Sequence, residues 1–240
     1  MTLAFDGTAY HGWQMQRNHP TVQGIVEAAI ERITGGRVNL IGSGRTDAGT
    51  HARALIANFS SASQIPIENL VRGLNSLLPQ DIRILSAREA PQDFHSQRSA
   101  RSKIYRYQIY RGKVLPPHLA REHFHYPYPL DLDLMARGAR VFSGRHDFAS
   151  LAAQSGSAVT DTVRRVYRSE LKSIGRRLWY TVEADGFLHH MVRIIVGTLL
   201  HVGRRRMGLA DLRGLFEKRD RTFAGFTAPA RGLVLLRVRY

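Results

Sequence analysis

The 240-residue sequence contains no cysteine, which excludes disulfides, thiol nucleophiles and thiolate metal sites. It also lacks any apolar run near the roughly 20 residues that a membrane-spanning helix needs, so we expect no membrane segment. Acidic residues are scarce, with 19 Asp and Glu against 35 Lys and Arg, and the formal net charge is +16. This imbalance favours a polyanionic partner, and the missing cysteine suits a reducing cytoplasm.

Hydrophobic periodicity and turn residues predict a β-α-β-β-α-β order of elements in the first half of the chain. The expected strands cover residues 1–6, 37–42, 53–59 and 81–88, and the expected helices run from Thr21 to Ile33 and from Pro66 to Leu77. Thr21 is predicted to cap the first helix. Pro66 is predicted to take the first position of the second, where its missing N–H costs nothing.

The second half is predicted to have the same order. Its expected strands cover residues 101–110, 163–174, 177–185 and 233–239, and its expected helices cover 131–142, 189–203 and 208–218. Residues 113–130 show neither period and are expected to form a long loop. The whole order predicts an α+β protein with two ferredoxin-like lobes, residues 1–95 and 96–240, whose antiparallel sheets adjoin around a catalytic cleft.

One polar loop between two predicted strands holds a single carboxylate among glycines. Its sequence is Gly42-Ser43-Gly44-Arg45-Thr46-Asp47-Ala48-Gly49-Thr50-His51-Ala52. Glycine permits positive φ and close backbone approach, so the loop can present Asp47 to a ligand. A plain turn of small polar residues would have the same composition, and the local pattern does not separate the two interpretations.

The predicted helix 189–203 is apolar on almost every side, which is typical of a buried helix. Arg193 lies inside it and therefore needs an anionic partner, because an unpaired buried charge costs several kcal/mol or more. Asp47 is the candidate partner. Asp185 is the alternative.

Tyrosines alternate along the predicted strand 101–110, which places Tyr105 and Tyr107 on one face. Such rings usually pack in a core, but a tyrosine can also stack on a flipped-out base. Next to this strand, Arg98, Arg101 and Lys103 form a basic cluster that either follows an RNA backbone or is simply solvated.

A metal site is not expected. His123 and His125 lie close together in the sequence, but no third ligand stands at a recognisable spacing from them.

Four segments, in order, resemble the tRNA pseudouridine synthase A family. They are the opening 5–14 with 21–24, the catalytic loop 44–52, the tyrosine strand 103–107 and the arginine helix 187–193. The loop departs from the commonest family form in having Thr50 where valine is usual. The lack of long extensions favours the bacterial form.

The resemblance implies that Asp47 is the catalytic aspartate, that Tyr105 stacks on the target base and that Arg193 pairs with Asp47. Arg45 is implied to help in gating or base flipping. The family's activity converts uridine to pseudouridine in the tRNA anticodon stem-loop, at positions 38–40, as a homodimer without metal or cofactor. Chemically, Asp47 can act as a nucleophile toward the ribose or as a base.

Besides a tRNA pseudouridine synthase, the sequence leaves two other classes of protein open. A non-catalytic RNA-binding protein could bind RNA through its sheets, but it would leave Asp47 unexplained. A metal-dependent nuclease would need clustered acidic residues.

Overall fold

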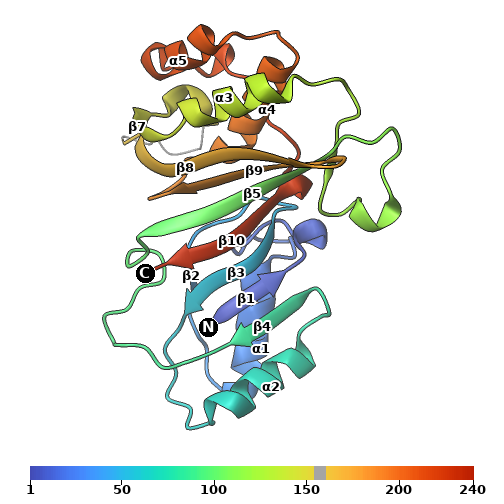
Figure 1. The fold of residues 1–240 in the computed structure, drawn as a ribbon. Coiled ribbons are helices and arrows are strands. Elements are labelled where there is room, and N and C mark those ends of the chain that lie inside the picture. Colours follow the sequence, from blue (N-terminus) through green and yellow to red (C-terminus); the bar gives the residue numbers. More distant parts are fainter. Residues whose placement is uncertain (154–160) are drawn as a thin grey trace. The chain divides into compact units, whose positions relative to one another are not determined.

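A computed structural model of the protein describes residues 1–153 and 161–240. The chain forms two compact units, Met1–Arg101 with Val234–Tyr240, and Ser102–Leu233. Each unit has its own strands and its own helices (Figure 1). The expected α+β class is confirmed, and the predicted domain boundary between residues 95 and 96 stays a prediction.

The first unit contains five strands and two α-helices. Its elements are β1 (Thr2–Phe5), the 3-10 helix η1 (Gly7–Ala9), α1 (Val22–Thr34), β2 (Ile41–Gly42), β3 (His51–Asn58), α2 (Ile67–Leu77), β4 (Ile82–Ser86) and β10 (Leu233–Arg239). Thr21 caps α1, as predicted, by accepting a hydrogen bond from Gly24 N. Pro66 takes the N-cap position of α2, one residue before the predicted place.

Strand β3 is the centre of this first sheet, with the order β4-β1-β3-β10. Strand β1 runs antiparallel to both β3 and β4. The other edge of β3 is shared, because β2 pairs with Ala57 and Asn58 whereas β10 pairs in parallel with His51 and Ala52. The sheet is therefore mixed rather than purely antiparallel. Strand β2 is shorter than the predicted strand 37–42, because in this antiparallel register residues 37–40 would lie beyond Asn58, where β3 ends.

The core of the first unit lies between the sheet and its helices. Burial alternates along β1 and β4, so one face of each strand packs inward. Leu3, Leu55 and Ile82 from the strands are fully buried, as are Val26 and Ile30 from α1. Helix α2 packs against α1 and beside β4. These contacts form the packed core that supports the Asp47 loop.

The second unit has a larger set of elements. They are β5 (Ser102–Tyr110), η2 (Pro117–Leu119), β6 (Phe124–His125), α3 (Leu132–Val141), β7 (Gly144–Asp147), η3 (Ala149–Leu151), β8 (Val163–Ile174), β9 (Arg177–Ala184), α4 (Met191–Gly203), α5 (Leu209–Lys218), η4 (Arg221–Phe223) and η5 (Ala230–Gly232). Its strands follow the order β5-β9-β8-β7, all antiparallel, and the short β6 pairs in parallel with β5.

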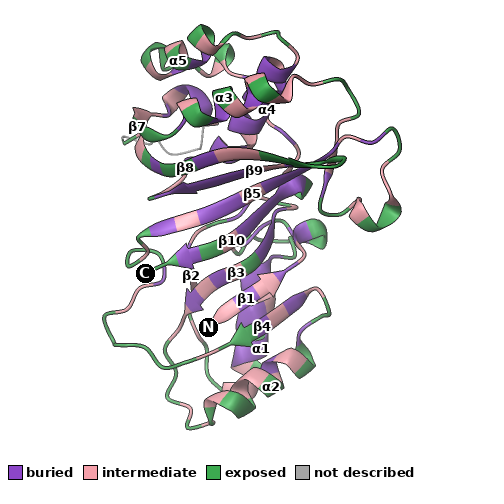
Figure 2. Ribbon diagram, viewed as in Figure 1, coloured by how far each residue is buried: buried purple, intermediate pink, exposed green. Residues whose placement is uncertain are grey.

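Helix α3 packs on β8 and contacts both α4 and α5 (Figure 1). Helix α4 is buried along nearly its whole length, as its apolar sequence predicts (Figure 2). The sequence analysis missed β6 and β7, of two and four residues, because such short pairings leave no periodic signal. No helix in the described part of the chain is long and apolar enough to cross a membrane.

Candidate active site

Asp47 stands on a loop between β2 and β3 that is fastened to the segment following β1. Trp13 N donates to Thr46 O (3.2 Å), and Gly49 N donates to Tyr10 O (3.2 Å). A further bond inside the loop runs from Thr50 N to Asp47 O (3.1 Å). The backbone on both sides of Asp47 is therefore fixed by hydrogen bonds, which sets the direction of its side chain.

Two glycines outside the loop make this fastening possible. A Cβ atom at Gly12 would lie 2.3 Å from Thr46 O, and one at Gly7 would lie 2.0 Å from Thr50 O. Gly12 also has φ +85°, which side chains rarely adopt. Any other residue at either position would push the Asp47 loop away, so both glycines belong to the site.

The loop's own glycines have more limited roles than the sequence suggests. Within the described chain, a positive φ occurs at Gly49 (φ +78°) but not at Gly42 or Gly44. Gly42 instead makes room for the buried Trp13, since a Cβ there would lie 2.5 Å from the indole ring. Trp13 thus packs beneath the start of the loop and supports it from below.

Tyr10 ties the same segment to the residue that precedes the edge strand β4. Its hydroxyl donates to Asp81 Oδ1 at 2.5 Å, and Asp6 N donates to Asp81 O at 2.9 Å. Burial, and then the hydrogen bond to Asp81, raises the pKa of the Tyr10 hydroxyl above its usual range. Tyr10 is therefore a neutral donor at physiological pH, and its backbone carbonyl holds Gly49.

Asp47 itself is half-buried, between the buried Thr46 and the exposed Ala48. Its carboxylate is thus shielded in part from bulk water while a substrate can still approach. The hydroxyls of Thr46 and Thr50 are buried without a hydrogen-bond partner among residues 1–153 and 161–240. Arg45, predicted to act in base flipping, is exposed beside them.

In the second unit, Tyr105 lies on β5 opposite Val182 of β9. Its side chain is 7% exposed and meets the Phe187 ring edge to face, with centroids 5.1 Å apart. The neighbouring Tyr107 is fully buried, and its hydroxyl donates to Pro229 O at 2.6 Å. Tyr107 is therefore a core residue, whereas Tyr105 lies at the margin of the core.

Arg193 lies in the first turn of α4 and is half-buried, unlike its buried neighbours Val192 and Ile194. Its Nε donates to Ala228 O at 2.7 Å, and Ala228 N donates to Arg193 O at 3.1 Å. These two bonds fix the guanidinium near the positive end of the helix dipole, where an anion is stabilised.

Asp185, the alternative partner of Arg193, is engaged elsewhere. Its carboxylate accepts hydrogen bonds from Arg165 N at 3.1 and 3.2 Å, and it is exposed. Within the described part of the chain it forms no ion pair with Arg193.

The predicted basic residues have different environments. Arg98 and Arg101 are exposed in the first unit. Lys103 is half-buried on β5 of the second unit, and burial, with Arg164 nearby, lowers its pKa. Exposed guanidinium groups suit phosphate contacts, whereas the partly desolvated Lys103 suits a contact closer to a base or ribose.

The two histidines of the loop 113–130 singled out by the sequence have different surroundings. His125 Nε2 bonds to Gly112 O at 2.8 Å. His123 is 4% exposed, and burial, with Arg177 next in effect, lowers its pKa and keeps its ring neutral. Among the described residues, neither belongs to a group of three potential metal ligands.

Sequence reasoning assigned no role to Tyr10, Trp13 or the glycines at positions 7 and 12. The signal was present in the run Phe5-Asp6-Gly7-Thr8-Ala9-Tyr10-His11-Gly12-Trp13-Gln14. Its two glycines flank aromatic residues, a pattern typical of close backbone packing, but the partner of that packing lies about 40 residues away and cannot be seen locally.

Known proteins similar to this chain show which family it belongs to. A sequence profile described as tRNA pseudouridine synthase matches residues 1–97 and 139–240. The tRNA pseudouridine synthase A of Caldicellulosiruptor bescii is 46% identical over 240 residues, covering 100% of this chain and 98% of the relative. Those of Moorella thermoacetica and Pelobacter propionicus are 46% and 45% identical, with the same coverage. The chain belongs to the tRNA pseudouridine synthases, which are isomerases.

Proposed function

We propose that the protein converts uridine to pseudouridine in the anticodon stem-loop of tRNA, at positions 38–40, with Asp47 as the catalytic carboxylate. One observation carries the proposal. A lone, half-buried carboxylate stands on a loop whose backbone is fixed on both sides by hydrogen bonds to residues 10 and 13. That arrangement suits a group that must meet one ribose in one orientation.

The reaction needs little more than this geometry. The N1–C1′ bond of uridine breaks, the freed uracil turns, and a C5–C1′ bond forms, after which the C5 proton is replaced by one at N1. Asp47 acts as a nucleophile at the ribose or as a base that removes a ribose proton. Neither role changes the redox state or consumes a second substrate.

Arg193 is proposed as the cation that pairs with Asp47 in the working enzyme. Its guanidinium is anchored by Ala228 O and lies in the first turn of α4, so the helix dipole adds to its positive field. A carboxylate placed there is favoured in its charged form. Asp185 is already bonded to Arg165 N.

Tyr105 and the basic residues are proposed to bind the RNA. The target uridine must leave its stack, at a cost of a few kcal/mol, which stacking on the Tyr105 ring offsets in part. Arg45 assists the flipping. Arg98, Arg101 and Lys103 contact phosphate and ribose, with the overall charge of +16 steering the RNA.

We further propose that the enzyme is a homodimer in the cytoplasm. The large surface of a tRNA and the small size of the 27.1 kDa chain favour a dimer that binds one RNA across both copies. Sedimentation of the purified protein with and without tRNA tests this state.

The direct experiment incubates the purified protein with an unmodified tRNA transcript in the presence of EDTA, followed by nucleoside analysis and position mapping. Pseudouridine at positions 38–40 is the expected product. Intact, unmodified RNA would identify a non-catalytic RNA-binding protein and refute the proposal. Cleaved RNA, formed without EDTA and lost with it, would identify a metal-dependent nuclease.

A further inference from the structure

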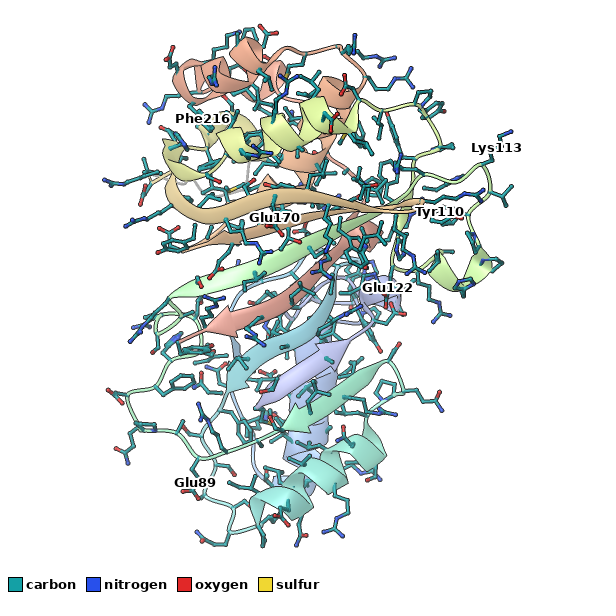
Figure 3. The ribbon with its side chains drawn as sticks, in the orientation of Figure 1. Glu89, Tyr110, Lys113, Glu122, Glu170 and Phe216 are labelled. Carbon is teal, nitrogen blue, oxygen red and sulfur yellow. The ribbon has the colours of Figure 1, made fainter. Side chains whose placement is uncertain are left out.

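A hollow of about 520 Å³ lies in the second unit, between α3 and α5 and beside β7. Phe216 on α5 lines it (Figure 3). None of the residues proposed for catalysis or base binding contributes to its lining. Its volume falls in the range of about 300–1,000 Å³ that is usual for small-ligand sites.

The rim of the hollow is basic. Arg137 and Arg140 lie one turn apart on α3, on the same face of the helix, and Arg213 of α5 joins them. All three side chains are exposed. The one lining carboxylate, Glu217, makes no ion pair within 4.0 Å with any of them in the part of the chain that the structure describes. Three guanidinium groups thus remain available to an anion.

The floor of the hollow is aromatic and rigid. The rings of His146 and Phe216 stack with centroids 4.2 Å apart and an angle of 11°. The fully buried Phe142 and Phe148 meet Phe216 edge to face, at 6.2 and 5.5 Å. His146 is further fixed by a hydrogen bond between Nε2 and Ser143 O (2.9 Å). His146 and Phe216 are half-buried, so the stack is partly open to the hollow.

We infer that this hollow binds the phosphodiester backbone of the RNA substrate, away from the nucleotide that is modified. Guanidinium groups form paired hydrogen bonds with phosphate oxygens, and a flat aromatic floor offers the neighbouring ribose or base an apolar surface. An acidic protein surface would meet the same charges, but the stacked aromatic rings beside three guanidinium groups favour a nucleotide, which carries a phosphate and a flat base together. The inference rests on the proposed function, because it takes tRNA as the ligand.

The test removes two arginine charges from the rim of the hollow. The tRNA affinity of this variant is compared with that of a variant that has lost two arginine charges elsewhere. The test variant is Arg140→Gln with Arg213→Gln. The control is Arg32→Gln with Arg37→Gln, two exposed residues of the first unit. The affinity for unmodified tRNA transcript is measured by fluorescence anisotropy between 50 and 300 mM KCl. Each lost phosphate contact should flatten the plot of log K against log salt by about 0.7–0.9.

We expect the test variant to bind tRNA about tenfold more weakly at 100 mM salt, with a flatter salt dependence, while the control changes less than twofold. Arg140→Lys with Arg213→Lys should restore the salt slope. Equal losses in test and control variants would show a general charge effect and overturn the inference. Wild-type binding of tRNA by the test variant would also overturn the inference. If that variant bound tRNA normally and only its sedimentation changed, the hollow would be identified as a protein interface.

Two further measurements separate these outcomes from misfolding and from a failure of the proposed function. Thermal melting checks that the variants fold, and the single changes Arg140→Gln and Arg213→Gln are used if the double variant does not. Pseudouridine formation by the wild type is scored separately. A wild type that binds tRNA but makes no product would refute the proposed function, whereas a wild-type level of binding by the test variant refutes the hollow alone.

Discussion

Replacing Thr50 by valine should stabilise the protein, although the residue lies in the proposed catalytic loop. Thr50 is 1% exposed, and its hydroxyl has no hydrogen-bond partner among the described residues. The contacts by which Thr50 holds the loop in place are made by its backbone, since Thr50 N donates to Asp47 O and the Thr50 carbonyl lies against Gly7. Valine keeps that backbone and the branched shape, and replaces only the hydroxyl with a methyl group.

The size of the effect follows from the cost of burying a hydroxyl without a partner, which is about 1–3 kcal/mol. Part of this is lost because threonine and valine do not pack identically, so we expect a gain of about 1–2 kcal/mol. For a chain of this length, such a gain raises Tm by about 2–8 °C.

Thr198→Val is the matched control. Thr198 is also fully buried, but its hydroxyl donates to Ile194 O (2.8 Å) and accepts from Gly225 N (2.9 Å). The same change there should lower Tm, because Gly225 N loses its partner. Differential scanning calorimetry of both variants gives the comparison. A Thr50→Val protein that melts below wild type would show that the Thr50 hydroxyl is bonded and that this account of the loop is mistaken.

Three other predictions concern the same structure. Gly12→Ala should lose about 2–5 kcal/mol of stability, from the positive φ and the overlap with Thr46 O, whereas Gly36→Ala, with open space around its Cβ, should melt like wild type. Equal melting of the two would contradict the close approach. His123 has a pKa that burial lowers, so its folded form stays neutral while the unfolded chain binds a proton below about pH 6.5. Stability should therefore be complete above that pH and fall as the solution is acidified, and His123→Phe should lose less between pH 7.5 and 5.5 in urea titrations. A wild-type slope in that variant would refute a neutral buried ring. Tyr105→Phe should keep tRNA affinity within about twofold, because the stacking ring remains; a large loss in an anisotropy assay would show that the hydroxyl takes part in binding.

The order of elements was predictable because each long helix and strand carries its own periodicity. Strands β8 and β10 begin and end where the sequence predicts, and α1 and α4 differ by at most two residues at either end. The parallel pairing of β10 with β3 was not predictable, since it joins segments about 180 residues apart.

The site could be predicted in its charged groups but not in its supports. Asp47 stands out as the one acid in a glycine-rich loop, and Arg193 as the one charge in an apolar helix. The residues that hold Asp47 in place do not stand out from their neighbours in the sequence in this way. Gly7 and Gly12 matter only because the loop packs against them, and Tyr10 only because it reaches Asp81.

The central claim is that the Asp47 carboxylate performs the chemistry, and Asp47→Asn tests it most directly. The variant keeps the size of the side chain and the backbone bonds of the loop, so it should fold and bind tRNA. Its matched control is Asp93→Asn, a change at an exposed carboxylate of the same unit. After incubation with unmodified tRNA, nucleoside analysis should find no pseudouridine with Asp47→Asn and a normal amount with Asp93→Asn. Normal product from the purified Asp47→Asn protein would contradict the account.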